Sequence, residues 1–348
     1  ARRAQPPKGN RKMLIIVGAA SLAVILMAVF AIVVATRGGP AANPGSSAQG
    51  QQTNPAQSGA AHNTPRPSDA VSAYLQALAA GDAVAALSYA ADPVPTGVLL
   101  TNEVLAKSQN RAALTEIQVP VVEDQNATLV SATYTLGSSA VSESFDVVKV
   151  ADAWKISRAV KDLDLSFIVD GSVPVKINGV KVDQRSVSVL PGSYAFTTGL
   201  PYIGYGSKNV VLVKSPYVEA DTSRIQSQLT NSGEKAVISA TEKSFNKCLK
   251  AHSLTPKNCP MKLDSKYSYT KSTITWRQTG SDPFRKPKIT LTATQARIEI
   301  PLSLKLSGSC TYKGRSGNCS ATLTGKSVAV VKATTKPLKV NWLRPTGR

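Results

Sequence analysis

The chain has 348 residues, 42% of them hydrophobic, and a formal net charge of +20. This length is too great for a single typical domain, and the hydrophobic fraction is sufficient for two or three folded cores. The charge is uneven, because residues 1–67 carry +7, residues 68–160 carry −5, residues 161–217 carry +2 and residues 218–348 carry +16.

The first feature in chain order is residues 13–36, an apolar run without Asp, Glu, Lys, Arg, Asn, Gln or Pro. A helix needs roughly 20 apolar residues to cross a bilayer, whereas the apolar region of a cleaved signal peptide has about 7–15. The run therefore predicts a transmembrane helix, with a buried core helix or an uncleaved signal as the alternative. The tail 1–12 is basic and has no acidic residue. Because such a flank stays in the cytoplasm, we expect a single-pass cell-membrane protein whose following domains are extracellular.

Residues 37–67 are mostly Gly, Pro, Ser, Gln and Ala and contain no aromatic residue. A segment of this composition cannot bury a core. It predicts a flexible linker between the membrane helix and the first folded domain.

The first folded domain is expected over residues 68–160. Ser68 or Asp69 is expected to cap a first helix that ends at Gly81, Asp82 to cap a second, and residues 101–113 to form a third. Alternating apolar and polar residues then predict four strands. These strands are residues 117–121, 127–136, 144–150 and 153–156. Helices followed by a strand meander indicate an α+β domain with the helices on one face of a sheet.

Three segments of this domain, AYLQALAAGDAVAALSY, ATLVSATYTL and FDVVKVADAWKI, resemble the nuclear-transport-factor-2-like fold. The resemblance implies a cone-shaped α+β domain, which lies just outside the membrane in many high-GC Gram-positive proteins. Enzymes of this fold usually place His, Asp or Tyr in the cone, and residues 68–160 contain no His. Tyr74, Tyr134 and Trp154 are interpreted as core residues.

Residues 161–217 are expected to form a small all-β, sandwich-like module. Asn178-Gly179 between alternating apolar residues predicts a β-hairpin. Residues 186–190 and 193–196 predict a further pair of strands across Pro191-Gly192. The phrases VKINGVKV and VLPGSYAF resemble the modules of bacterial surface proteins, including the teicoplanin-resistance-associated membrane protein family. That family has a similar arrangement of an inner tail, one membrane helix and serial outer domains.

Residues 218–348 are expected to form a basic, disulfide-containing α+β module. Ser232 is expected to cap a helix that ends near Leu249. Predicted strands follow at residues 268–277, 289–293, 297–306, 310–312, 319–323 and 328–331. The motif F..CL…L.P..CP at residues 245–260, followed by ITWR at 274–277 and a β meander, resembles the carboxy-terminal region of actinobacterial membrane-anchored exported proteins, from which no activity can be transferred.

All four cysteines lie in this last module, and an even number in an exported domain predicts disulfides. Three pairings are possible, and we favour Cys248–Cys259 and Cys310–Cys319. The second pair flanks the turn-forming run 313–317, as expected for a bridge across a hairpin. A zinc site is the alternative, but neither pair has the CxxC spacing. No metal site is therefore predicted.

The positive charge of the last module predicts binding to polyanions, with screening by salt. The polyanions expected outside a cell are anionic cell-wall polymers or lipid head groups rather than nucleic acid. The alternative is that the positive charge only keeps the protein soluble. The candidate polyanion-binding residues are Arg285, Lys286, Lys288, Lys313 and Arg315.

The leading hypothesis is therefore a non-catalytic, cell-surface binding or accessory protein of a Gram-positive envelope. The alternative is a regulatory subunit that docks a membrane-bound wall-synthesis or export complex through residues 68–160. An envelope enzyme is the third hypothesis, but no nucleophile–base–orienter set is visible, so no catalytic residue and no cofactor is predicted. The SxxK matches at 232–235 and 244–247 lack the KTG motif of penicillin-binding proteins.

Overall fold

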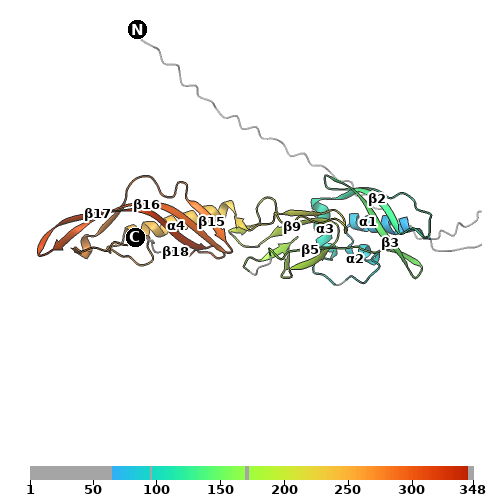
Figure 1. Cartoon of the computed structure of the whole chain (residues 1–348), viewed down its shortest axis with the longest axis horizontal. Helices are drawn as coiled ribbons and strands as arrows, with labels where there is room; N and C mark the ends of the chain where they lie inside the picture. The colour runs from blue at the N-terminus through green and yellow to red at the C-terminus, as the bar shows by residue number, and fades with distance from the viewer. Residues whose placement is uncertain (1–64, 95, 169–171, 344–348) are drawn as a thin grey trace, which may run out of the picture. The chain divides into compact units, whose positions relative to one another are not determined.

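The computed structural model describes residues 65–94, 96–168 and 172–343 (Figure 1). The predicted tail 1–12 and transmembrane helix 13–36 lie outside these residues, as does the predicted linker up to residue 64. The chain divides into two units, Ala1–Ala61 and His62–Arg348, and the second contains all the described residues. These residues form a mixed α+β structure, mostly strands with few helices, as predicted.

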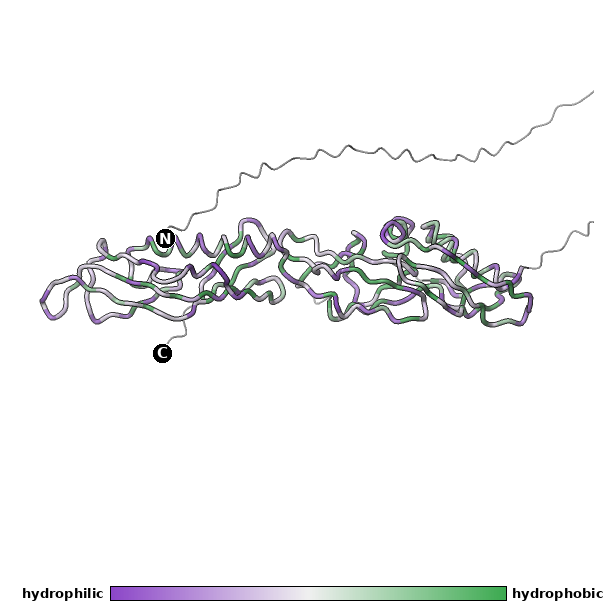
Figure 2. Tube along the Cα trace, turned by 90° about the horizontal axis from the view of Figure 1, so that it is seen from above, coloured by the Kyte–Doolittle hydropathy of each residue, from purple (hydrophilic) through white to green (hydrophobic). Residues whose placement is uncertain are grey.

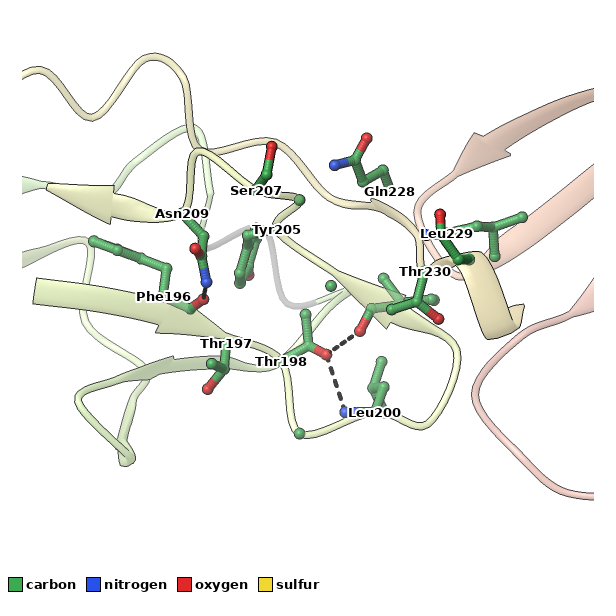
Figure 3. A pocket seen from close by; sticks show the side chains of 15 residues that line it. Phe196, Thr197, Thr198, Leu200, Tyr205, Ser207, Asn209, Gln228, Leu229 and Thr230 are labelled. Carbon is green, nitrogen blue, oxygen red and sulfur yellow. Dashed lines mark hydrogen bonds between the residues drawn. The ribbon is translucent and has the colours of Figure 1, made fainter. Parts of the chain in front are cut away.

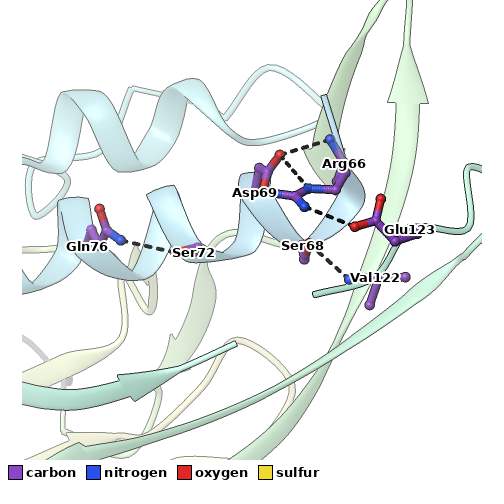
Figure 4. Close-up of polar contacts among 7 residues, drawn as sticks. All are labelled: Arg66, Ser68, Asp69, Ser72, Gln76, Val122 and Glu123. Carbon is purple, nitrogen blue, oxygen red and sulfur yellow. Dashed lines mark hydrogen bonds and ion pairs between the residues drawn. The ribbon is translucent and has the colours of Figure 1, made fainter. Parts of the chain in front are cut away.

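The first helix, α1 (Pro67–Ala80), begins earlier than predicted, so the last residue of the predicted linker belongs to it. Pro67 suits the first helical position because the amide hydrogen it lacks would have no partner there. Asp69 accepts a hydrogen bond from the backbone nitrogen of Arg66 at 3.1 Å (Figure 4), so Asp69 acts from within the first turn. Ser68 instead accepts from the backbone nitrogen of Val122 at 3.2 Å. The prediction that either residue precedes the helix as its cap was wrong.

Two short helices follow α1. The predicted end of α1 at Gly81 and the predicted cap of the second helix at Asp82 agree with the structure, whereas the third helix is shorter than the predicted segment 101–113. Gly81 ends α1 with a positive φ of 74°. Asp82 caps α2 (Ala83–Ser88) by accepting a hydrogen bond from the backbone nitrogen of Ala85 at 3.0 Å. Thr101 caps α3 (Asn102–Arg111). The prediction of three helices in this part of the chain is confirmed.

An antiparallel sheet of order β1-β2-β3-β4 completes this part of the chain. Its strands are β1 (Leu114–Gln118), β2 (Leu129–Leu136), β3 (Ser139–Val150) and β4 (Ala153–Ile156). The predicted first strand, 117–121, was misplaced toward the carboxy terminus, because Pro120 has no amide hydrogen to donate to a ladder. Helix α1 buries Tyr74, Leu75 and Leu78 in the same core as Tyr134, Phe145 and Trp154. The three aromatic residues interpreted as core residues are therefore buried.

The next part of the chain is all β, as predicted. Its strands are β5 (Lys161–Asp164), β6 (Val175–Ile177), β7 (Val180–Val182), β8 (Ser186–Val189), β9 (Gly192–Thr197), β10 (Ile203–Gly204), β11 (Val210–Val213) and β12 (Gln228–Leu229). Asn178 and Gly179 connect β6 to β7 with φ angles of 48° and 90°, which is the hairpin turn that this dipeptide favours.

One strand pairing in this region was predicted wrongly. Strands β8 and β9 do not pair with each other, since β8 pairs with β5 and β9 pairs with β6 and β11. The chain passes from one sheet to the other at Pro191, which has no amide hydrogen for a ladder. Tyr194 stabilises the segment between the two sheets, because its hydroxyl donates a hydrogen bond to the carbonyl oxygen of Leu190 at 2.6 Å.

The last part of the chain packs helix α4 (Asn231–Leu249) on one face of a six-stranded sheet (Figure 2). Thr230 caps this helix by accepting from the backbone nitrogen of Gly233 at 3.0 Å, so the cap predicted at Ser232 was wrong. Phe245 and Val237 contact a core that includes Leu304. The remaining elements are β13 (Ser268–Tyr269), the 3-10 helix η1 (Lys271–Thr273), β14 (Thr275–Gln278), β15 (Lys288–Thr292), β16 (Gln295–Tyr312), β17 (Arg315–Lys332) and β18 (Val340–Trp342).

Strands β16 and β17 form one long hairpin of two 18-residue strands. The sequence predicted four shorter strands here, with breaks at 307–309 and 324–327. Those breaks fall where the apolar alternation ends, but backbone pairing continues through them. The turn is also shorter than the predicted run 313–317, since only Lys313 and Gly314 lie between the strands.

The two disulfides are Cys248–Cys259 and Cys310–Cys319, as favoured, with Cα–Cα distances of 5.6 and 5.8 Å. The first holds the loop after α4 to the end of that helix. The second joins β16 to β17 diagonally, since Cys310 lies opposite Gly317 and Cys319 lies opposite Gly308.

Candidate functional site

The six-stranded sheet has one apolar face and one polar face. On β16, buried residues such as Ile298, Leu304 and Leu306 alternate with more exposed polar ones. Residues directly opposite each other on paired strands lie on the same face of the sheet. The pairing of β16 with its neighbours therefore shows which residues of those strands lie on each face. Helix α4 and the hydrophobic core cover the apolar face. We call the other side the cationic face.

In the part of the chain that the structure describes, six basic residues and one acidic residue, Glu299, lie on the strands of the cationic face. All six basic side chains are exposed. They are Arg277, Lys288, Arg297, Lys305, Lys326 and Lys332. Most of the other residues on this face are Ser or Thr, whose hydroxyls can donate hydrogen bonds.

Two of these cations are direct neighbours. Arg277 on β14 lies opposite Lys305 on β16 in the antiparallel register. Within the described residues, no carboxylate forms an ion pair with either side chain. Like charges directly opposite each other on paired strands destabilise a sheet. An anion placed between the two side chains would remove this repulsion.

An open cavity of about 420 Å³ lies beside Lys305. Ser307, Ser309 and Ser320 line it together with Asn318, and Thr273 of η1 closes one side. In the part of the chain that the structure describes, the side chains of these three serines and of Asn318 form no hydrogen bond. Lys305 therefore stands beside several free donors. This combination suits the oxygen atoms of a phosphate group.

Among the described residues, one ion pair lies on the cationic face. Lys326 donates to Glu299 at 2.9 Å. The hydrogen bond from Lys326 lowers the pKa of the Glu299 carboxyl, and the same bond raises the pKa of the Lys326 amine. Lys326 therefore already has a carboxylate partner on this face.

The structure divides the five predicted polyanion-binding residues into separate groups. Lys288 lies on the cationic face, opposite Glu299, and Arg285 and Lys286 are exposed in the loop that precedes it. Lys313 and Arg315 are exposed at the hairpin tip, where Arg315 lies opposite Tyr312. Tyr312 lies thirteen positions after Glu299 on β16, which corresponds to about 43 Å. The five residues therefore do not form one compact site.

The hairpin tip also carries an aromatic pair that the sequence prediction missed. The rings of Tyr267 and Tyr312 lie with their centroids 5.1 Å apart, and each residue is 37% exposed. The amine of Lys266 lies 5.7 and 5.4 Å from the two ring centroids, and that of Lys313 lies 5.7 Å from the Tyr312 ring. Only the pairing of β13 with the end of β16 brings these residues together.

His252 is hydrogen-bonded to the backbone. Its Nδ1 atom lies 2.8 Å from the carbonyl oxygen of Ile274, so this nitrogen donates a hydrogen bond to it. The neighbouring Cys248 is bonded to Cys259. Among the described residues, no group of three or more His, Cys, Asp or Glu side chains is placed to hold a metal ion.

Comparison of the chain with known protein families, with curated proteins and with solved structures found no match. Within residues 65–343, apart from the gaps at 95 and 169–171, no helix is both long and apolar enough to cross a membrane.

Proposed function

We propose that this chain is a single-pass, cell-surface binding or accessory protein of a bacterial envelope, and that its cationic face binds a phosphate-bearing polymer of the cell wall. The observation that best supports this function is the pair Arg277 and Lys305, two like charges held opposite each other that form no ion pair with any carboxylate among the described residues. A structural role alone would favour a neutral or an acidic residue at one of these positions.

The type of anion follows from the donors on the cationic face. Guanidinium, ammonium and hydroxyl groups together match the several oxygen atoms of a phosphate. The cations are also spread along the sheet, since Arg297 and Lys305 lie eight residues apart on β16, or about 27 Å. This spacing favours an extended polymer with repeated charges over a single small anion.

The hairpin tip provides a second contact in this proposal. Tyrosine rings offer an apolar surface with a polar end, and lysine stems cover apolar surface while their amines remain in water. The tip cluster of Tyr267, Tyr312, Lys266 and Lys313 therefore suits a partner that carries both anionic groups and sugar or polyol carbon.

The proposed location rests on the sequence and on the disulfides. Residues 13–36 would anchor the chain, with residues 1–12 in the cytoplasm and the described residues outside. Two disulfides are typical of an oxidising, extracytoplasmic compartment. A nuclear-transport-factor-2-like fold for residues 68–160 is part of the proposal, and the order of three helices followed by four antiparallel strands supports it.

Co-sedimentation of the full chain with purified Gram-positive cell walls tests this function. We expect binding that falls as salt rises, because screening weakens contacts between exposed charges. Walls stripped of their phosphodiester polymer should lose most of the bound protein. Salt-independent binding, or equal binding to stripped walls, would contradict the proposal. Vesicles of phosphatidylglycerol form a second arm, and binding to these vesicles without binding to walls would assign the cationic face to lipid head groups instead.

A further inference from the structure

A second cavity, of about 570 Å³, lies in a different part of the molecule (Figure 3). The segment between β9 and β10, the segment between β10 and β11, strand β12 and the first residue of α4 surround it. The pairing of β10 with β12 holds these segments together. The volume is within the range of small-molecule sites.

The described residues that line this cavity carry no formal charge. Among them there is no Asp, Glu, Lys, Arg or His. Leu200 and Leu229 provide apolar surface, whereas Thr197, Ser207, Gln228 and Asn231 provide hydroxyl and amide groups. A charged ligand would lose hydration here, and none of these described lining residues would supply an opposite charge, so the lining favours an uncharged polar ligand.

The walls of the cavity are held by hydrogen bonds among its own residues. Thr198 donates to the carbonyl oxygen of Ile203 and accepts from the backbone nitrogen of Leu200 at 3.0 Å (Figure 3). Asn209 donates to the carbonyl oxygen of Phe196 at 2.7 Å. The side chains of Thr198 and Asn209 therefore fix the shape of the cavity before a ligand arrives.

Other polar groups of the cavity remain available. Within the described part of the chain, the side chains of Thr197, Ser207, Gln228 and Asn231 form no hydrogen bond. The Gln228 amide lies against Gly206, since a Cβ at that position would come within 1.7 Å of Nε2 of Gln228. Gly206 also has a positive φ of 71°, which side-chain-bearing residues rarely adopt. The glycine therefore keeps the amide group at the cavity wall.

We propose that this cavity binds an uncharged saccharide that carries an N-acetyl group. The amides of Gln228 and Asn231 can each donate to and accept from the acetamido group, and the hydroxyls of Thr197 and Ser207 can pair with sugar hydroxyls. Leu200 and Leu229 provide contacts for the acetyl methyl group and the sugar carbons. This site is separate from the cationic face and does not depend on the function proposed for it.

Saturation-transfer NMR on the full chain, in a detergent without a sugar head group, tests the proposal. The two probes are diacetylchitobiose and cellobiose, which are β-1,4-linked disaccharides that differ by their acetamido groups. We expect saturation of the acetyl methyl protons of diacetylchitobiose and a much weaker signal from cellobiose. Absence of any signal, or equal signals from both sugars, would overturn the proposal.

Substitutions in the cavity test whether the disaccharide binds there. Gln228→Ala and Asn231→Ala should each weaken the binding of diacetylchitobiose roughly threefold to tenfold, the effect of one lost neutral hydrogen bond. Gln226→Ala is the matched control, because Gln226 is an exposed amide two residues away that does not line this cavity. Equal affinity in all three variants and the unmodified chain would place the sugar elsewhere and overturn the assignment. Gln228 and Asn231 are exposed, so both variants are expected to fold.

Discussion

Arg277 and Lys305 lie directly opposite each other on neighbouring antiparallel strands, and both side chains are exposed. Within the described residues, neither forms an ion pair with a carboxylate. This relationship costs folding stability, since like charges in opposite positions repel each other. In the function proposed above, the phosphate groups of the bound polymer would supply the missing negative charge.

The first prediction concerns the stability cost of this pair. Arg277→Gln removes one of the two facing charges, so we expect the free energy of unfolding to increase by about 0.2–1 kcal/mol at low salt. Urea denaturation at low and high salt measures this change, which should shrink as salt screens the repulsion. A decrease in stability, or a change that salt does not affect, would show that the two charges do not repel each other.

The second prediction concerns the Cys248–Cys259 disulfide. The loop that this bond closes contains Asn258, which donates to the carbonyl oxygen of Val340 and accepts from the backbone nitrogen of Trp342, both at 2.9 Å. Replacement of both cysteines by Ser should therefore lower the free energy of unfolding by about 2–4 kcal/mol. Limited proteolysis should then cut the loop 250–263 faster.

The matched control for this experiment is the Cys310→Ser, Cys319→Ser variant, because its disulfide closes a loop of similar length within a continuous ladder. This variant should lose stability without faster cleavage of the loop 250–263. Equal cleavage of that loop in both variants would contradict the role given to Asn258.

The third prediction concerns the contact between α3 and β9. A Cβ on Gly192 would lie 2.2 Å from Oγ of Ser108, and that oxygen accepts from the backbone nitrogen of Ser193 at 2.5 Å. Gly192→Ala should therefore destabilise the protein by about 1–3 kcal/mol through overpacking. The same substitution should cost less in a Ser108→Ala background, where the hydroxyl is absent. Additive effects in this double-mutant cycle, measured by urea denaturation, would disprove the close contact.

The fourth prediction concerns alkaline pH. Burial raises the pKa of the Tyr194 hydroxyl above its ordinary value of about 10. The unfolded chain therefore loses this proton at a lower pH than the folded chain. The contribution of the raised pKa of Tyr194 to the free energy of unfolding is therefore complete below pH 10, and it is lost as the pH rises above 10. Tyr194→Phe should flatten the decline in the free energy of unfolding above pH 10, by up to about 1.4 kcal/mol per pH unit. An unchanged decline, measured by urea denaturation at several pH values, would contradict this.

Local patterns predicted much of the fold. The first helix was recognisable because apolar residues such as Val71, Leu75 and Leu78 recur at helical spacing, and both disulfide pairs were favoured on their spacing. Strand pairing was less predictable. Strands β8 and β9 adjoin in sequence but pair with other strands, because Pro191 interrupts the ladder there.

The candidate site was only partly predictable for the same reason. Exposed basic residues such as Lys288 and Lys313 could be recognised from the charge of the last module. The facing positions of Arg277 and Lys305 depend on the register between β14 and β16, which no short sequence pattern reveals. The tyrosine pair at the hairpin tip likewise depends on the pairing of β13 with β16.

The most direct test of the central claim compares two double variants in the cell-wall binding assay. Arg277→Gln with Lys305→Gln removes two charges from the cationic face. Lys235→Gln with Lys243→Gln removes two exposed charges from α4, which lies on the opposite side of the sheet. The net charge is the same in both proteins. We predict that the first variant loses most of its wall binding at moderate salt, while the second binds nearly as well as the unmodified chain. Equal losses in the two variants would show that overall charge, rather than the cationic face, determines binding.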